Sequence, residues 1–121
     1  MQINLEAKDK HTVQSYSDSE LRINSNLYHS NLIVSAHEII EDWSIKTIQD
    51  LNEDSLTPLL RYEPKIIIIG HNQLGKFAPL SVMQTLSKDR IGLECMSIGA
   101  ACRTFNVLLS EQRDVVLGII F

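Results

Sequence analysis

The chain has few cysteines, no cluster of basic residues and no long apolar run, and each shortage excludes a class of protein. Only two of its 121 residues are cysteines. This is too few for the disulfide framework of a small secreted domain, so Cys95 and Cys102 are expected to be reduced thiols. The formal charge is −4, from 11 basic and 15 acidic residues. Because the basic residues are spread along the chain, we expect no broad face that attracts nucleic acid.

No apolar run approaches the roughly 20 residues that a membrane-spanning helix needs. Residues 1–10 mix two acidic residues with two lysines and lack both the apolar centre of a signal peptide and the basic bias of a transit peptide. The sequence therefore predicts a cytoplasmic protein without a transmembrane segment. Its length fits a single domain, 1–121, that buries roughly two thirds of the surface of its unfolded chain and needs no disulfide or metal to fold.

The first half of the chain, residues 1–51, is expected to form mostly a β meander. Three short β-friendly runs lie at 12–17, 21–23 and 31–35. The Ser, Asp and Asn residues between them favour turns, because their side chains bond the local backbone. A further strand is predicted around Trp43 and Ile45, which alternate with polar residues. Trp43 is expected to be a buried core anchor rather than a residue of a binding surface.

The second half, residues 52–121, changes to an alternation of helices and strands. Leucines three and four apart predict a short helix that begins near Asp54 or Ser55 and ends before Pro64. The run 66–69 is entirely isoleucine, which is typical of a central strand covered on both faces. A helix at 79–87, a strand at 91–97, a helix at 99–110 and a strand at 115–121 complete the pattern. This β-α-β-α-β order predicts an α/β layered sandwich with the meander on one side.

The segment Gly70–Lys76 has the spacing of a phosphate-binding P-loop, and it follows a buried strand as that motif does. The next residue, however, is Phe77, where a Ser or Thr hydroxyl would be needed to hold Mg²⁺. No later strand supplies the Asp that would complete a metal site. We therefore interpret the segment as a surface turn whose glycines permit tight backbone geometry.

Arg103 is expected near the start of the helix 99–110, where the helix dipole disfavours a cation by about 0.3–1 kcal/mol unless an acidic group lies close. One interpretation is a salt bridge to Glu94 or Glu111, since an arginine commonly pairs with a carboxylate. The other is a binding site for an anion, because helix N-termini favour negative charge. Backbone amides would then join Arg103 in the site, namely those of Gly99, Ala100 and Ala101.

A helix start can also lower the pKa of a thiol, which makes Cys102 a candidate nucleophile. Of the four histidines only His71 is expected on a loop at the same end of the sheet, and no local signature supports a pair with Cys102. We favour a small buried thiol instead. The sequence spells neither a metal site nor a pair of catalytic carboxylates, and it suggests no cofactor.

Four motifs together resemble a known family. They are KIIIIG at 65–70, FAP at 77–79, IGLE at 91–94 and GAACRTFNVLLSE at 99–111. With them the chain resembles the small-domain family of unknown biochemical function that includes mitochondrial respiratory complex I (NADH:ubiquinone oxidoreductase) assembly factor 3 and its short bacterial and archaeal relatives. The resemblance is concentrated in residues 64–121. It implies an α/β fold with a mixed central sheet and a small β layer, and it carries over no catalytic residue.

Two loops depart from the family's usual pattern. Where the family has Gly-Thr-Gly, Gly70 is followed by His71 and Asn72, and where it has Asp-Thr, this chain has Ser97 and Ile98. A carboxylate and a threonine hydroxyl are thereby lost from the loops that would face a site.

The leading hypothesis is a non-enzymatic cytoplasmic accessory protein that binds protein partners; the resemblance suggests respiratory complex subunits as partners. A homodimer through an edge strand is also conceivable. The alternative hypothesis is a domain that binds a small anionic ligand, or a weak enzyme, with its site in a cleft between the Gly70–Lys76 loop and the Gly99–Arg103 helix start. The residues of this hypothetical anion site are Gly70, His71, Lys76, Gly99, Ala100, Ala101, Arg103 and Asn106.

Overall fold

The computed structural model describes residues 11–121, in two sheets and three α-helices. The features predicted for residues 1–10 lie outside the described part. The strands are β1 (Val13–Tyr16), β2 (Leu21–Ile23), β3 (Asn26–Tyr28), β4 (Leu32–Val34), β5 (Ile39–Glu41), β6 (Ile66–His71), β7 (Gly92–Met96) and β8 (Val115–Ile120). The helices are α2 (Glu53–Leu60), α3 (Leu80–Lys88), α4 (Ile98–Ser110) and a 3₁₀ helix η1 (Ile48–Asp50).

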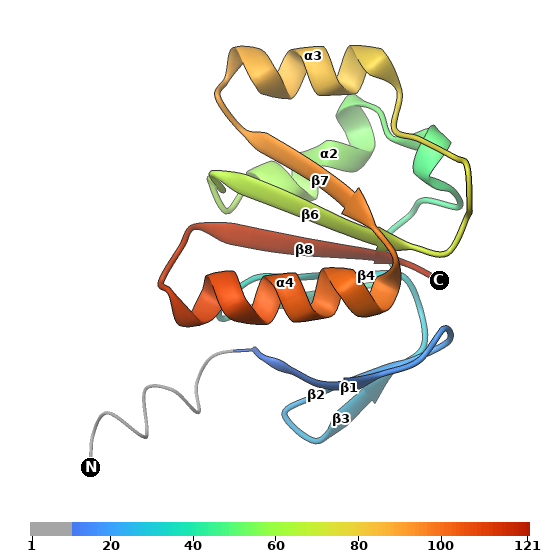
Figure 1. Ribbon diagram of the computed structural model, residues 1–121, viewed down its shortest axis with the longest axis vertical. Helices are drawn as coiled ribbons and strands as arrows, with labels where there is room; N and C mark the ends of the chain where they lie inside the picture. The colour runs from blue at the N-terminus through green and yellow to red at the C-terminus, as the bar shows by residue number, and fades with distance from the viewer. Residues whose placement is uncertain (1–10) are drawn as a thin grey trace.

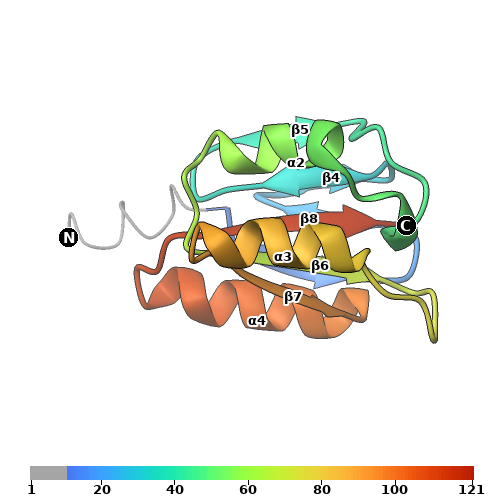
Figure 2. The same ribbon diagram turned by 90° about the horizontal axis from the view of Figure 1, so that it is seen from above.

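The five-stranded sheet has the order β5-β4-β8-β6-β7. Strand β6 runs parallel to both β7 and β8, whereas β4 runs antiparallel to β8 and β5. Helices α2 and α3 cover one face of this sheet and α4 covers the other, as Figures 1 and 2 show. The predicted α/β sandwich with a mixed central sheet is therefore confirmed.

The isoleucine run of β6 is buried on both faces, as its lack of alternation predicts. Ile67 and Ile69 belong to the apolar cluster under α2 and α3, whereas Ile68 belongs to the cluster under α4. Side chains alternate across a strand, so one strand supplies both layers with core residues. Burial of β6 therefore holds the two helical layers against a common sheet.

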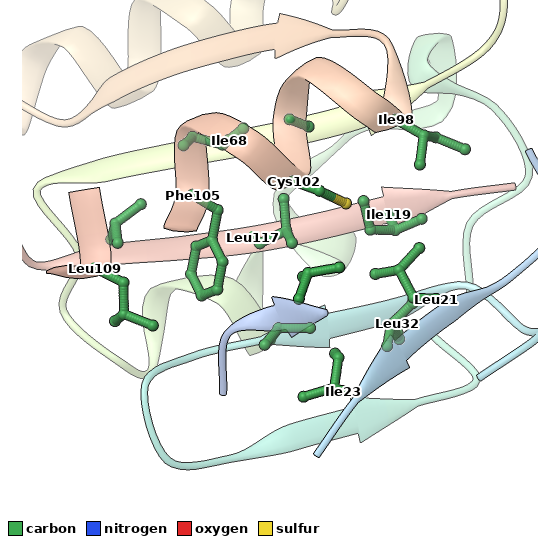
Figure 3. Close-up of a cluster of buried hydrophobic side chains, with 14 residues drawn as sticks. Leu21, Ile23, Leu32, Ile68, Ile98, Cys102, Phe105, Leu109, Leu117 and Ile119 are labelled. Carbon is green, nitrogen blue, oxygen red and sulfur yellow. The ribbon is translucent and has the colours of Figure 1, made fainter. Parts of the chain in front are cut away.

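The small sheet, in the order β1-β2-β3, lies beside α4. Leu21 and Ile23 of β2 share one buried cluster with Phe105 and Leu109 of α4, which Figure 3 shows. Every second residue of β2 is fully buried, as expected for a strand with one face on the core. The N-terminal half thus closes the α4 face of the molecule.

The N-terminal half differs from the prediction in two ways. It does not form one meander, because β4 and β5 join the central sheet instead of the small one. The strand predicted around Trp43 and Ile45 is wrong, since this segment is a bend. The burial of Trp43 is confirmed: its Nε1–H donates to the Ser55 carbonyl oxygen at 3.1 Å, and its ring packs on Gly118 of β8. Buried apolar residues in this bend alternate with exposed polar residues, as they would in a strand, so the sequence pattern does not distinguish the two.

The starts of α2 and α4 are fixed by polar side chains just before them, whereas α3 starts after Pro79 without a side-chain cap. The Asn52 Oδ1 accepts from the Ser55 backbone N–H at the start of α2, and the Ser97 Oγ accepts from the Ala100 N–H at the start of α4. Such caps satisfy amides that have no partner within the helix. Between residues 11 and 121, no helix combines the length and the apolar character that crossing a membrane requires.

We predict that Gly70→Ala destabilises the fold. An added Cβ at Gly70 would lie 2.8 Å from the Cβ of Ala101 and 3.1 Å from the Cα of Ile98, so α4 would have to move away from the sheet. Overpacking of this kind costs about 1–3 kcal/mol of unfolding free energy. Gly92→Ala is the matched control, because its nearest contact would be 3.8 Å. Urea denaturation of both variants gives the comparison, and equal losses would contradict the proposed close contact.

Candidate functional site

The carboxyl ends of β6 and β7 bring the two predicted loops to the same edge of the sheet. Gly70 is paired with Met96 in the parallel register, and an ideal Cβ at Gly70 lies 3.1 Å from the Cα of Ile98. A hollow of about 420 Å³ lies between these loops and is lined by Asp18 and by residues 71–76 and 96–97. The predicted proximity of the two loops is thus found in the fold.

The eight residues of the hypothetical anion site do not share this hollow. Gly70 and Ala101 are buried against each other between the sheet and α4. Only His71 and Lys76 of the eight line the hollow. Although the two loops lie close together, the eight residues do not all line one hollow. The anion site stays a prediction.

Asn106 connects α4 to the small sheet. Its Nδ2–H donates to the Val13 carbonyl oxygen and its Oδ1 accepts from the Val13 backbone N–H, both at 2.9 Å. This pair of bonds is the one that a neighbouring strand would make with β1. One N–H and one lone pair of the Asn106 amide are therefore engaged in holding β1.

Arg103 pairs with a tyrosine instead of a carboxylate. Its guanidinium donates to the Tyr16 hydroxyl and lies 5.9 Å from the centre of the Tyr16 ring. The predicted salt bridge to Glu94 or Glu111 is wrong, because neither carboxylate lies within ion-pair distance of Arg103. The negative face of the Tyr16 ring and the Tyr16 hydroxyl oxygen stabilise the positive charge of Arg103, which the helix dipole disfavours near the start of α4.

The amides at the start of α4 are also largely occupied. The Ala100 N–H donates to the Ser97 Oγ, and the Ala101 N–H donates to the Ser97 carbonyl oxygen at 2.8 Å. The third amide predicted to face an anion is that of Gly99, and the Tyr16 ring lies over this residue. Part of the helix start is therefore packed against β1 through the contact of Tyr16 with Gly99.

His71 lies on the other face of the sheet from α4. It follows Ile67 and Ile69 at intervals of two, so its side chain points to the layer of α2 and α3. Its Nδ1 accepts from the Gln73 backbone N–H at 3.2 Å, and burial lowers the pKa of the imidazole below its usual range. Cys102 belongs to the cluster under α4, so the sheet separates it from His71. A Cys102–His71 catalytic pair is excluded.

The Gly70–Lys76 segment does not have the arrangement of a P-loop. Gly70 is still within β6, and α3 begins only at Leu80, after Pro79. Three residues separate Lys76 from the helix, whereas a P-loop leads directly into the helix whose amides hold the phosphate. The interpretation as a surface turn agrees with this geometry.

Neither thiol is activated. Burial raises the pKa of Cys102 to about 12 in spite of the neighbouring Arg103, and the predicted buried thiol is confirmed. Cys95 reaches the surface on β7, but partial burial and the Glu94 carboxylate raise its pKa to about 11. Across the described residues no three His, Cys, Asp or Glu side chains are grouped as metal ligands would be.

Sequence reasoning missed another hollow, which lies next to α2. It measures about 870 Å³ and is lined mainly by the bend after β5 and the first turns of α2. Trp43 and Pro58 contribute apolar surface, and Asp42, Asp50 and Asp54 contribute carboxylates. Part of the lining is a bend that the sequence pattern assigned to a strand, so no signal in the sequence located this hollow.

We predict that Asn106→Ala loosens the small sheet. The substitution removes both bonds to Val13 and leaves its backbone groups without those partners, at a cost of about 1–3 kcal/mol. Arg103→Ala, which removes only an exposed contact, should cost at most about 1 kcal/mol. Hydrogen exchange of the β1 and β2 amides measures the effect, and unchanged protection in Asn106→Ala would contradict it.

We also predict slow alkylation of the native protein. The thiolate is the reactive form, so with a pKa of about 11 the iodoacetamide reaction of Cys95 should speed up about tenfold per pH unit between neutrality and pH 10. Cys102 should react only after unfolding. Cys95→Ser is the control and should leave the native protein unlabelled. Rapid labelling of Cys95 at neutral pH would show that its pKa is not raised.

Residues 13–120 match a protein family described as a protein of unknown function, DUF498/DUF598. The Francisella tularensis protein named 13 kDa major membrane protein is 30% identical over 108 residues, which cover 88% of each chain. The Drosophila melanogaster NADH dehydrogenase (ubiquinone) 1 alpha subcomplex assembly factor 3 is 31% identical over 112 residues. These cover 89% of the present chain but only 57% of the fly protein, so the chain spans little more than half of that relative.

The NMR structure of a Xanthomonas campestris protein has the same fold. It superposes with a TM-score of 0.83 at 28% identity and covers 99% of this chain and 92% of that protein. The resemblance seen in the motifs of residues 64–121 is confirmed, and it extends over nearly all of the described residues. The chain belongs to the DUF498/DUF598 family of proteins of unknown function.

Proposed function

We propose that the chain is a non-enzymatic cytoplasmic accessory domain that binds a strand of a protein partner along β7. The observation that carries this proposal is the unpaired edge that β7 forms on one side of the central sheet; β5 forms the other edge. Strand β7 is outermost, and among residues 11–121 no strand pairs with its outer side. An unpaired row of backbone N–H and C=O groups is a template for a strand from another chain.

The direction of the unpaired groups follows from one hydrogen bond. The Gly92 N–H donates to the Lys65 carbonyl oxygen at 2.9 Å and so points toward β6. Because these groups alternate along a strand, the N–H and C=O groups of Leu93 and Cys95 point away from the sheet. A partner strand would bind these two residues.

Helix α3 adds apolar side chains beside this edge. Val82 and Leu86 are buried against the sheet, and Ser81 and Thr85 face α2 across a small hollow. The opposite side of α3, toward β7, therefore carries Leu80 and Met83, which are 68% and 45% exposed. We define the edge surface as Leu80, Met83, Leu93 and Cys95. Its apolar side chains beside unpaired backbone groups suit an extended peptide segment.

A different chain is a better occupant than a second copy. An antiparallel pair of two β7 strands centred on Glu94 would place two exposed carboxylates opposite each other, which is destabilising. The similarity to assembly factor 3 supports an accessory role, and subunits of NADH:ubiquinone oxidoreductase are the partners that it suggests. An anionic-ligand site receives no comparable support, because Arg103, Asn106 and the α4 amides are engaged within the protein.

We predict that Cys95→Pro abolishes partner binding without unfolding the protein. Proline at this position removes an N–H that points to solvent, and proline is tolerated on such edges. Met83→Asp should also weaken binding, because it places a charge on the edge surface. Val107→Asp is the matched control, since Val107 is 55% exposed on α4 and lies outside the edge surface.

The test replaces the gene in its native host and measures assembled NADH:ubiquinone oxidoreductase by native electrophoresis, together with cross-links from the purified chain to its subunits. Wild type and Val107→Asp should support assembly, whereas Cys95→Pro and Met83→Asp should not. Thermal melting shows whether each variant is folded. Normal assembly with Cys95→Pro would rule out strand addition at β7, and normal assembly without the gene would rule out the accessory role.

A further inference from the structure

The loop between β6 and α3 carries two bulky apolar side chains at its tip. We define the loop tip as residues 74–77, namely Leu74, Gly75, Lys76 and Phe77. Leu74 is 97% exposed and Phe77 is 74% exposed. An added Cβ at Gly75, whose φ is +74°, would meet no atom within 4 Å. Figure 2 shows this loop projecting beyond the ends of the neighbouring strands. The tip is therefore an apolar projection into solvent, and one side of it borders the hollow described above.

The base of the loop is fastened to the rest of the protein. The Gln73 Oε1 accepts from the Ile48 backbone N–H at 3.2 Å, and the Asn72 Nδ2–H donates to Asp18 at 3.2 Å. Within the tip, the Lys76 N–H donates to the Gln73 carbonyl oxygen at 3.2 Å. These bonds hold Leu74 and Phe77 outward. Because the tip is already ordered, little conformational entropy is lost when it binds.

The charge around the tip differs from that of the whole chain. The chain carries a formal charge of −4, yet the segment between Glu63 and Asp89 contains three lysines and no acidic residue. One of these lysines, Lys76, stands between the two apolar residues of the tip. Asp18 contributes a carboxylate to the lining of the hollow, and it accepts from Asn72. The tip therefore presents a cation beside apolar side chains.

We propose that the loop tip inserts into a lipid surface. Leu74 and Phe77 enter the boundary between headgroups and acyl chains, and Lys76 extends to the headgroup phosphates. A lipid surface receives a projecting tip without a complementary pocket, whereas a protein partner would need one that fits both side chains. Lys76 adds an attraction to anionic lipids. This inference is independent of the proposed function, since it uses none of the residues of the edge surface.

A tryptophan at the tip reports insertion directly. In the Phe77→Trp variant, indole emission should shift to the blue when phosphatidylcholine vesicles containing phosphatidylglycerol are added, and brominated lipids should quench it. Wild type supplies the control, because its single tryptophan, Trp43, is buried and its emission should not change. Emission of Phe77→Trp that does not change with either vesicle composition would overturn the proposal.

Vesicle flotation of the full chain separates the contributions. Leu74→Ser and Phe77→Ser should each lower the partition coefficient about tenfold, since each removes an apolar side chain that the bilayer would bury. Lys76→Gln should remove most of the dependence on phosphatidylglycerol, and Val107→Ser should change nothing. Failure of the wild-type protein to float with either vesicle would refute lipid insertion. A Phe77→Trp emission shift that occurs only when a protein partner is added would also refute it and would favour a protein contact at the tip.

Discussion

Strand β6 has isoleucine side chains in both apolar clusters, and the rest of the structure depends on that double burial. Because β6 lies between β8 and β7, its position fixes the two crossovers through α3 and α4. The loop before α3 and the turn before α4 are thereby brought to one edge of the sheet. At Gly70 the contact with α4 is so close that no side chain fits between them. The position of these two loops, where the sequence predicted a site, is thus set by the packing of β6 and α4.

The sequence was sufficient for the elements with a strong period and insufficient for those fixed by distant partners. The isoleucines of β6 and the leucine spacing of α2 predicted a strand and a helix at the right places. Strands β3 and β5 were not predicted, although β2 and β4, which are equally short, were. The bend around Trp43 is held by the Trp43 N–H, which donates to the Asn31 carbonyl oxygen, and by packing on Gly118. No local pattern reveals such long-range contacts.

The candidate site shows the same limit more sharply. The sequence located both loops, but the contacts of their side chains are decided by β1. Tyr16 reaches Arg103 across 87 residues of chain and Val13 reaches Asn106 across 93, and neither pairing follows from spacing along α4. The predicted carboxylate partners of Arg103 were its neighbours in sequence. The sequence therefore showed which charged and polar residues lie on α4. The packing of the small sheet against α4 decides which of these side chains are engaged by β1.

Exposed apolar side chains are concentrated in the loop before α3 and in the first turns of α3. Among the described residues, seven large apolar side chains are exposed, and four of these fall within residues 74–83. Leu74 and Phe77 lie on the loop that Gln73 and Asn72 fasten, whereas Leu80 and Met83 lie on α3. Exposure of this kind costs solubility, which the net negative charge offsets elsewhere on the surface. The loop tip and the edge surface both belong to the unit β6-α3-β7, so the proposed lipid contact and the proposed strand contact would come from adjacent parts of the same supersecondary unit.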